Sequence, residues 1–213
     1  MTNVAAIVLA AGQSTRFRAA GGGEETKLVA TLDDKPIVRC VVETAIASRA
    51  HPVVVVVGHA RGSVEAALAG LPATLAYNPD YATGLASSLR AGLTATPLET
   101  QGALILLGDM PGVEPGLIDA LIDAFEAQRG ALAVAPVKDG RRGNPVLLAR
   151  ALFDRARLLT GDEGARRLLG ALPKGHVVEI AAPGSDVVFD IDTPSDLEDA
   201  RRNERHRPSS CSD

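Results

Sequence analysis

The chain has 213 residues, of which 46% are hydrophobic and 23% are charged, as in ordinary globular domains. A net charge of −4, only 3% aromatic residues and the absence of Trp argue against a nucleic-acid partner. No apolar run reaches the roughly 18 residues that a membrane-spanning helix needs, which argues against a membrane partner. The two cysteines, Cys40 and Cys211, give neither a disulfide framework nor a metal-ligand spacing, so we expect a cytoplasmic protein.

Strand and helix signals alternate along the chain. In order, they predict a strand at 4–9, a helix at 36–50, a strand at 53–57, a helix at 61–69, a strand at 73–77, a helix at 85–95, a strand at 103–107 and a helix at 115–128. They continue with a strand at 131–135, a turn through GRRGNP, a short strand at 146–148, helices at 149–158 and 163–172, strands at 176–180 and 187–190, and a helix at 194–203. The five consecutive valines at 53–57 are typical of a strand that is covered on both faces.

This alternation predicts the fold class. Strands that are joined through helices form a mostly parallel sheet, so we expect a Rossmann-like, three-layer α/β/α sandwich. We place it in a single domain over residues 1–200, and we expect the charged and then Ser-rich end at 201–213 to be disordered. Ligands of such sheets bind at the carboxyl ends of the strands, so the residues directly after each strand are the candidates for function.

The first candidate is the turn AAGQSTR at 10–16, which directly follows the first strand. Ala10, Ala11 and Gly12 are small enough for backbone N–H groups to approach an anion. Arg16 can hold two phosphate oxygens, and Lys27 can add a mobile positive charge. The same residues also fit a plain bend with an exposed arginine, so the turn alone leaves both interpretations open.

Two acidic segments follow later strands. Asp109 in GDMPG comes directly after the strand at 103–107, where its carboxylate fits either a Mg²⁺ site or the cap of a turn. Asp190 and Asp192 in FDIDTPSDL are two residues apart, so they point the same way if the strand continues. Thr193 is a good start for the next helix, which does not explain the two carboxylates before it. We therefore interpret Asp192 or Asp190 as the second ligand of a metal bound by Asp109.

Two further parts of the sequence carry polar residues after predicted strands. The stretch NPDYATGLASSLRAGL at 78–93 includes Asn78 and Ser88, which fit contacts to a nucleobase or simple helix caps. The segments GRRGNP and TGDEGARRLL supply four arginines, which fit an anionic second substrate or a solvated surface: Arg141, Arg142, Arg166 and Arg167.

Six segments occur in a fixed order: LAAGQSTRF with a later KL, NPDYATGLASSLRAGL, GDMPG, GRRGNPVL, GDEGARRLL and DIDTPSDL. Over residues 3–200 they resemble the MobA-like nucleotidyltransferases, and more closely the molybdenum cofactor cytidylyltransferase branch. The resemblance implies the nucleotide-diphospho-sugar transferase type of the Rossmann-like fold. It also implies that a nucleoside triphosphate binds with Mg²⁺, that a phosphate of the second substrate attacks its α-phosphorus, and that pyrophosphate leaves.

The resemblance also assigns roles to individual positions. The catalytic residues would be Arg16, Lys27 and Asp109. The nucleotide would contact Leu9, Ala10, Ala11, Gly12, Arg16, Lys27, Asn78, Gly84 and Ser88. The Mg²⁺ ion would be held by Asp109 with Asp192 or Asp190. The second substrate would face Gly143, Asn144, Pro145, Gly161 and Asp162.

The same resemblance implies CTP as the donor, because LAAG with Ala11 accompanies cytidine rather than guanosine in this family. The acceptor would be a molybdopterin-type phosphate, with a molybdoenzyme as a further partner. Three alternatives stay open: a sugar- or alcohol-phosphate acceptor, GTP as the donor, and a non-catalytic chaperone that binds nucleotide or cofactor for a molybdoenzyme. The chain departs from the family in the insert RFRAAGGGEETK, which places Lys27 eleven positions after Arg16. We expect this insert to be a flexible loop that orders when the nucleotide binds.

Overall fold

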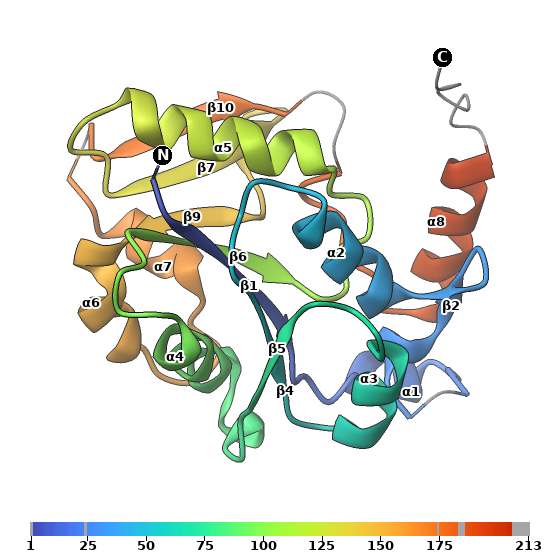
Figure 1. Ribbon diagram of the computed structural model, residues 1–213. Coiled ribbons are helices and arrows are strands. Elements are labelled where there is room, and N and C mark those ends of the chain that lie inside the picture. Colours follow the sequence, from blue (N-terminus) through green and yellow to red (C-terminus); the bar gives the residue numbers. More distant parts are fainter. Residues whose placement is uncertain (1, 24, 174, 183–185, 206–213) are drawn as a thin grey trace.

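A computed structural model describes residues 2–23, 25–173, 175–182 and 186–205 (Figure 1). Among these residues the strands are β1 (Val4–Ala10), β2 (Thr31–Leu32), β3 (Lys35–Pro36), β4 (Val53–Val57), β5 (Thr74–Tyr77), β6 (Gly102–Leu107), β7 (Ala133–Lys138), β8 (Arg141–Arg142), β9 (Val146–Ala149) and β10 (Val177–Ala181). The α-helices are α1 (Thr15–Ala19), α2 (Ile37–Ile46), α3 (Arg61–Ala67), α4 (Leu85–Ala95), α5 (Pro115–Ala127), α6 (Phe153–Arg157), α7 (Ala165–Gly170) and α8 (Pro194–Arg205). Short 3₁₀ turns lie at η1 (Lys27–Val29), η2 (Tyr81–Thr83) and η3 (Arg150–Leu152).

Within the described residues, eight strands form one sheet, in the order β10-β7-β9-β6-β1-β4-β5 with β8 paired to β7. β1 pairs in parallel with β4 and β6, β4 with β5, and β7 with β10, whereas β9 is antiparallel to both of its neighbours. The chain moves outward from β1 to β4 and β5 and then returns to the other side of β1 as β6. This reversal brings the turns after β1 and β6 together at one edge of the sheet, where ligands of such sheets bind.

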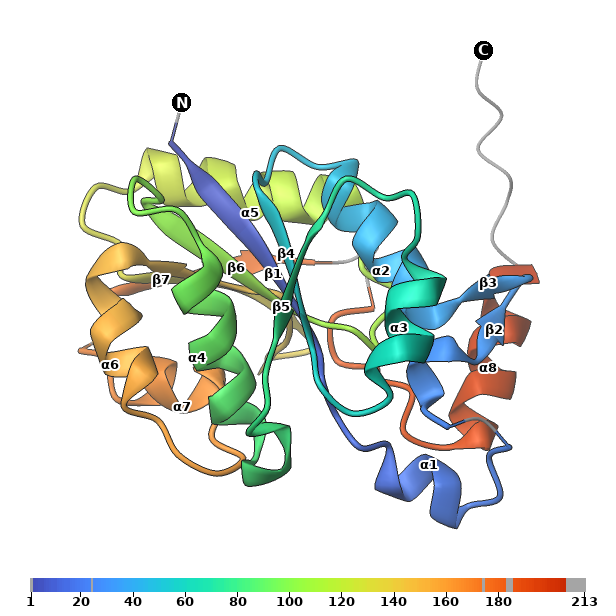
Figure 2. The same cartoon turned by 60° about the horizontal axis from the view of Figure 1, so that its bottom comes forward.

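Helices cover both faces of the sheet (Figures 1 and 2). All seven residues of β1 are buried, and they alternate between two hydrophobic cores. Ala6 and Val8 belong to the core formed with α2, α3 and α5, whereas Ile7 and Leu9 belong to the core formed with α4, α6 and α7. The predicted three-layer α/β/α sandwich with a mostly parallel sheet is therefore confirmed.

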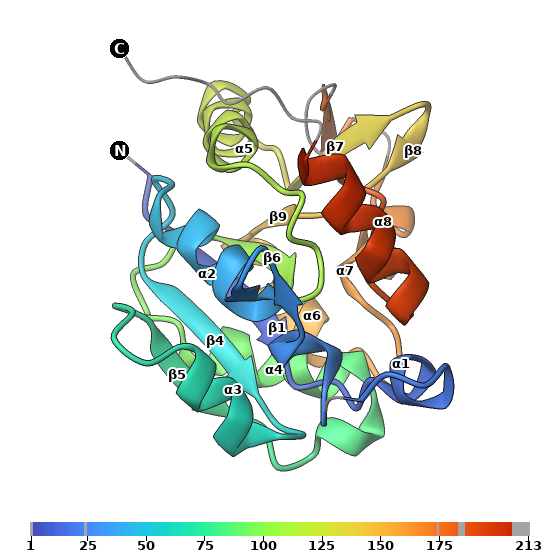
Figure 3. The same cartoon turned by 90° about the vertical axis from the view of Figure 1, so that its right-hand side faces the viewer.

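A third, smaller hydrophobic cluster ties the last helix to the segment that follows β1. Leu197 and Ala200 of α8 pack with Phe17 of α1 and with Leu32 and Ile37. Figure 2 shows α8 beside β2, and Figure 3 shows α8 and α1 on the same side of the molecule. Phe17 thus fixes one end of the segment between Arg16 and Lys27 to the core.

Most predicted elements are confirmed with small shifts at their ends, but the strand predicted at 187–190 is wrong. The residues there bond to neighbouring loops instead of a strand, as in the bond from Asn144 N to Val187 O of 2.8 Å. The helix predicted at 149–158 is divided into η3 and α6, and the helix predicted at 163–172 is shortened to α7. The sequence pattern did not predict α1, β2, β3 or β8.

The last helix continues to Arg205, two residues beyond its predicted end. Residues 206–213, which carry most of the predicted disordered end, lie outside the described residues. None of the helices in the described ranges is long and apolar enough to cross a membrane.

We predict that Gly92→Ala destabilises the fold, because α4 packs closely on the sheet at this position. A methyl group at residue 92 would overlap Ile7 Cγ2 and lie 3.1 Å from Val56 Cγ2, and both side chains are buried. The strain should exceed the roughly 1 kcal/mol that alanine gains over glycine in a helix, so we expect a net loss of about 1–2 kcal/mol in the free energy of unfolding. Urea denaturation measures this loss. Gly116→Ala in α5, with open space around residue 116, is the control and should be neutral or stabilising. Equal effects of the two substitutions would contradict this account of the packing.

Candidate functional site

Two adjoining cavities open at the carboxyl ends of β1 and β6. The first has a volume of about 530 Å³ and the second about 460 Å³. Both are lined by Leu9, Leu85, Leu107 and Asp162, so these residues form a shared wall. The two cavities can therefore hold two molecules side by side.

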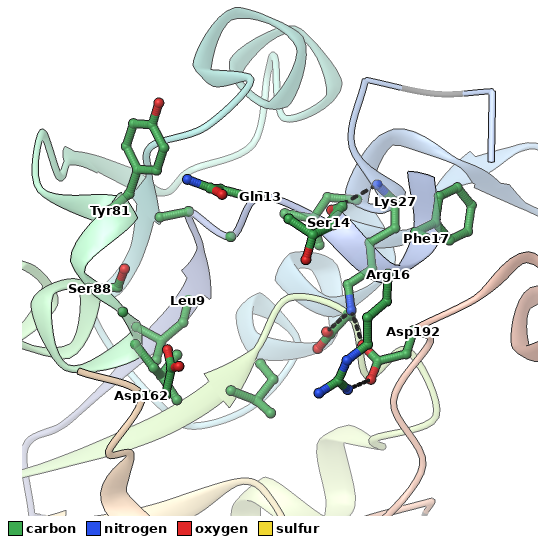
Figure 4. A pocket seen from close by; sticks show the side chains of 18 of the residues that line it. Leu9, Gln13, Ser14, Arg16, Phe17, Lys27, Tyr81, Ser88, Asp162 and Asp192 are labelled. Carbon is green, nitrogen blue, oxygen red and sulfur yellow. Dashed lines mark hydrogen bonds and ion pairs between the residues drawn. The ribbon is translucent and has the colours of Figure 1, made fainter. Parts of the chain in front are cut away.

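The turn after β1 forms one wall of the first cavity (Figure 4). Ser14 adopts a left-handed backbone conformation, with φ of 53°, and α1 begins directly after it. Its hydroxyl oxygen lies 2.9 Å from Thr26 Oγ1 and accepts a hydrogen bond of 3.1 Å from the backbone N–H of Lys27. This contact closes the insert into a loop, so Arg16 and Lys27 reach the same cavity although eleven positions separate them.

The segment from Asp186 to Asp192, here called the carboxylate segment, lies between the turns that contain Gly112 and Gly143. The backbone N–H of Asp186 donates to Gly112 O, and a methyl group on Gly112 would lie 2.8 Å from Asp186 Cβ. A methyl group on Gly143 would overlap the carbonyl group of Val187. Glycine at both positions lets the backbones approach closely, and this approach holds the start of the carboxylate segment in place.

The end of the carboxylate segment lies against the turn after β6. The backbone N–H of Ile191 donates to Asp109 O over 3.1 Å, and the Ile191 side chain is buried. Asp190 and Asp192, on either side of Ile191, therefore meet Asp109. Carboxylate oxygens of the three residues lie within 4.8 Å of one another.

Lys27 neutralises two of these carboxylates. Its Nζ lies 2.6 Å from Asp109 Oδ2 and 2.7 Å from Asp192 Oδ1, and its side chain is only 12% exposed. Arg16 Nη1 lies 2.6 Å from the other oxygen of Asp192, but the Arg16 side chain is 78% exposed. Figure 4 shows both cations directed at Asp192. Because salt and water screen the exposed pair, the Lys27 pairs dominate the cluster.

The charges in the cluster shift the pKa values of its members. Burial alone would lower the pKa of Lys27, but the charges and hydrogen bonds of Asp109 and Asp192 outweigh burial and raise that pKa above 10.5. Partial burial would raise the pKa of Asp192, but its bonds to Lys27 and Arg16 hold the pKa below 3.8. Partial burial, with the charges of Asp192 and Asp109, raises the pKa of Asp190 above 3.8. The shifts of Lys27 and Asp192 favour the charged forms of both groups, whereas the shift of Asp190 favours its neutral form.

Over most of its length, the chain matches a known protein family. The MobA-like NTP transferase domain matches residues 6–177. The chain belongs to this family. The predicted resemblance is therefore confirmed at the level of the family, and the chain carries a nucleotidyltransferase fold.

The relatives of known sequence include proteins that are named for different activities. The chain is 31% identical over 196 residues to the bifunctional protein GlmU of Leifsonia xyli subsp. xyli, covering 90% of this chain and 40% of that protein. It is 29% identical over 127 residues to the molybdenum cofactor cytidylyltransferase of Escherichia coli strain K12, covering 58% of this chain and 60% of that protein. The chain thus spans less than two thirds of the length of these curated relatives.

A solved structure covers nearly the whole chain. Rv0371c from Mycobacterium tuberculosis H37Rv superposes with a TM-score of 0.81 at 26% identity, over 94% of this chain and 98% of that one. A structure of the same mycobacterial protein in complex with manganese superposes with a TM-score of 0.76 at 24% identity, over 94% and 98% of the two chains.

Most residues that the sequence singled out line one of the two cavities. The first cavity is lined by Leu9, Ala11, Gly12, Arg16, Lys27, Gly84, Ser88, Asp109, Asp162 and Asp192. The second is lined by Leu9, Asn144, Asp162 and Asp190, with Arg141, Arg142 and Arg166. Asp162, expected to contact the second substrate, lies in the wall between both.

Five of the expected contact residues line neither cavity: Ala10, Asn78, Gly143, Pro145 and Gly161. Ala10 is fully buried below the turn. Asn78 donates hydrogen bonds of 2.9 and 3.1 Å to the hydroxyls of Ser87 and Ser88, so it positions Ser88 instead of facing the cavity. Gly161 accepts a hydrogen bond from Ala86 N and packs against Gly84, which fixes the loop that carries Asp162.

The first cavity is also lined by Gln13, Phe17 and Tyr81, which were not predicted from the sequence. Figure 4 shows Tyr81 on the far side of Gln13 from Lys27, on the same side of the cavity as Ser88. The Tyr81 ring centroid lies 5.8 Å from that of His59. Tyr81 stands within the NPDYATG motif, and its aromatic type in a chain with 3% aromatic residues was the available signal.

We predict that Asp192→Asn lowers the free energy of unfolding at neutral pH, and that the loss becomes smaller in acid. The pKa of Asp192 is held below 3.8 in the folded protein, so its ion pairs stabilise the fold above that pH and are lost as pH falls through the folded pKa. We expect a loss of about 1–3 kcal/mol at pH 7 and a smaller loss at pH 3, measured by urea denaturation. Asp154→Asn is the control, because Asp154 is 95% exposed beside Arg157. A loss for Asp192→Asn that is independent of pH would contradict the electrostatic origin.

Proposed function

We propose that the protein transfers a cytidylyl group from CTP to a phosphorylated acceptor of the molybdopterin type and releases pyrophosphate. The observation that carries this proposal is the position of the carboxylate cluster. Asp109 and Asp192 line the first cavity and Asp190 lines the second. The negative charges of the three carboxylates therefore lie at the border between the cavities. A triphosphate in one cavity would meet an acceptor phosphate from the other at this border.

The first cavity suits a nucleoside triphosphate. Its cationic side carries Arg16 and Lys27, which suit the negative phosphates. Its opposite side carries Tyr81, Gly84 and Ser88, which suit a nucleobase and ribose. This polarity orients the nucleotide with its phosphates toward the carboxylate cluster.

The second cavity suits an anionic acceptor with an apolar body. Among the described residues, the guanidinium groups of Arg141 and Arg166 make no ion pair, so both are available to an anion. Leu89, Met110 and Val188 give the same cavity an apolar surface. A flat ring system that carries a phosphate has this combination of properties.

The three carboxylates fit a divalent ion such as Mg²⁺. Mg²⁺ prefers oxygen ligands, and it commonly binds through one or two carboxylates together with substrate phosphates. Asp109 and Asp192 would hold it, with Asp190 close by, and the manganese complex of Rv0371c supports a divalent ion in this fold. When bound, the ion would supply charge neutralisation at the reacting phosphates.

The residues of the chain then act by position and charge. Phosphoryl transfer depends more on orientation and neutralisation than on a strong base. Lys27 and Arg16 would hold the triphosphate and neutralise the charge that develops on the leaving pyrophosphate. The wall made by Asp162 and Leu9 would align the acceptor with the α-phosphorus. Such an enzyme would act in the cytoplasm, where nucleoside triphosphates are available.

A second candidate acceptor is a sugar phosphate. It is favoured by the match to the bifunctional protein GlmU, which covers 90% of this chain.

The test of the proposed function is an assay of pyrophosphate release with CTP or GTP, using molybdopterin or a hexose 1-phosphate as acceptor and mass spectrometry of the product. Product from CTP and molybdopterin alone supports the proposal. Turnover with hexose phosphate alone favours the second candidate, and nucleotide binding without turnover favours a chaperone for a molybdoenzyme.

We predict that Asp109→Asn lowers turnover by at least about 10²-fold, because a neutral amide replaces the carboxylate that faces both the metal position and Lys27. The measurement is the initial rate of pyrophosphate release, with circular dichroism to show that the variant is folded. Asp154→Asn, the exposed control, should keep wild-type activity. A folded Asp109→Asn protein with wild-type turnover would exclude the metal assignment.

We predict that Ala11→Gly broadens the choice of nucleobase. Ala11 and Tyr81 both approach Gly58 closely, since a methyl group there would lie 2.8 Å from Ala11 Cβ and 2.7 Å from Tyr81 Cβ. Loss of the Ala11 methyl therefore opens space on the side of the cavity that suits the base. In thermal-shift assays with Mg²⁺, CTP at 100 times its dissociation constant should stabilise the wild type by about 2.7 kcal/mol. GTP, ATP and UTP at the same concentration should stabilise it less. Ala11→Gly should gain a GTP response, and no such gain would count against Ala11 as the base selector.

A further inference from the structure

The ammonium group of Lys27 fills the space between the two carboxylates that suit a metal. Its Nζ lies 2.6 Å from Asp109 Oδ2 and 2.7 Å from Asp192 Oδ1. Mg²⁺ binds carboxylate oxygens at about 2.0–2.1 Å. An ion on the same two oxygens would lie against the ammonium group, and the two positive charges would repel each other.

We propose that Lys27 is the resident cation of this site in the nucleotide-free protein, and that it leaves the carboxylates to a divalent ion only when a triphosphate draws it away. The inference rests on the function proposed above, because the nucleotide supplies the anion toward which Lys27 moves. Metal and nucleotide then bind cooperatively, and metal alone binds weakly.

The charges around the site favour this exchange. Both oxygens of Asp192 are occupied by cations, Oδ1 by Lys27 and Oδ2 by Arg16. Lys27 is the more effective of the two, because its side chain is 12% exposed and that of Arg16 is 78% exposed. Without Lys27, three carboxylates would face one screened cation, and the attraction for a divalent ion would rise.

The local structure allows the ammonium group to move while the backbone stays in place. The N–H of Lys27 is bonded to Ser14 Oγ, and the next residue, Leu28, is buried in the core at 4% exposure. The lysine side chain has four methylene groups and a point charge, so rotation about its bonds is enough to change partners. Lys27 already lines the first cavity, so a triphosphate bound there lies within its reach.

Thermodynamic linkage makes the effect reciprocal. If the nucleotide removes a competitor for the metal site, the metal must raise the affinity for the nucleotide by the same factor. Substitution of Lys27 by a neutral residue removes the competitor beforehand. The nucleotide-free variant should then bind metal more tightly than the wild type does.

The test is a titration of the nucleotide-free full chain with Mn²⁺ alone, following the electron paramagnetic resonance signal of unbound Mn²⁺. We expect Lys27→Met to bind Mn²⁺ between about 5- and 150-fold more tightly than the wild type, the usual range of coupling between two ligands. Lys35→Met is the matched control, because Lys35 pairs with Glu43 on the surface, and it should bind as the wild type does. Mn²⁺ affinity of Lys27→Met equal to or below that of the wild type would overturn the proposal.

Two further variants secure the interpretation. Lys27→Gln keeps a polar side chain and should also gain affinity, so it replaces Lys27→Met if thermal melting shows that the latter is unfolded. Asp109→Asn added to either variant should abolish the gain, and a gain that survives would overturn the assignment to this site. The titration contains neither CTP nor acceptor, so failure of the transferase assay and failure of this inference are distinguishable.

Discussion

The ion pairs of Lys27 with Asp109 and Asp192 join three distant parts of the chain. The bond to Asp192 spans 165 positions of sequence, and Asp109 lies in the turn after the central strand β6. For these side chains to meet, the insert after β1 must fold back and the carboxylate segment must pass along the turn after β6. Close contacts at Gly112 and Gly143 hold the carboxylate segment in this position. The packing of Phe17 and the hydrogen bond from Lys27 N to Ser14 Oγ hold the insert. The rest of the site is arranged around the ion pairs of Lys27.

The parts that could be predicted from sequence are those fixed by local pattern. Two strands follow from composition alone: the valines at 53–57 and the apolar run that ends at Leu107. Such continuous apolar runs are expected to be buried in any fold of this class. The position of Asp109 follows from its place directly after such a strand. The resemblance to the family depended on the order of six motifs, which no single segment carries, and the family match over residues 6–177 confirmed it.

The parts that could not be predicted depend on contacts between distant residues. Residues 187–190 have the composition of a strand, but their hydrogen bonds go to loops that glycines bring within reach. The helix α1 lies in a Gly- and Ala-rich insert, and Phe17 holds it through α8, which is far along the chain. The buried amide of Asn78 donates to two serine hydroxyls, and the motif alone does not predict these hydrogen bonds.

The wall shared by the two cavities has a consequence for the end of the reaction. Leu9, Leu85, Leu107 and Asp162 border both cavities, so the joined product would occupy both at once. In the proposed reaction, pyrophosphate can depart from the first cavity alone, but the larger product must leave both cavities in a single step. Such a product would behave as a bisubstrate ligand and would compete with both the nucleotide and the acceptor. Its departure, and not the entry of either substrate, would then limit how soon the site can be used again.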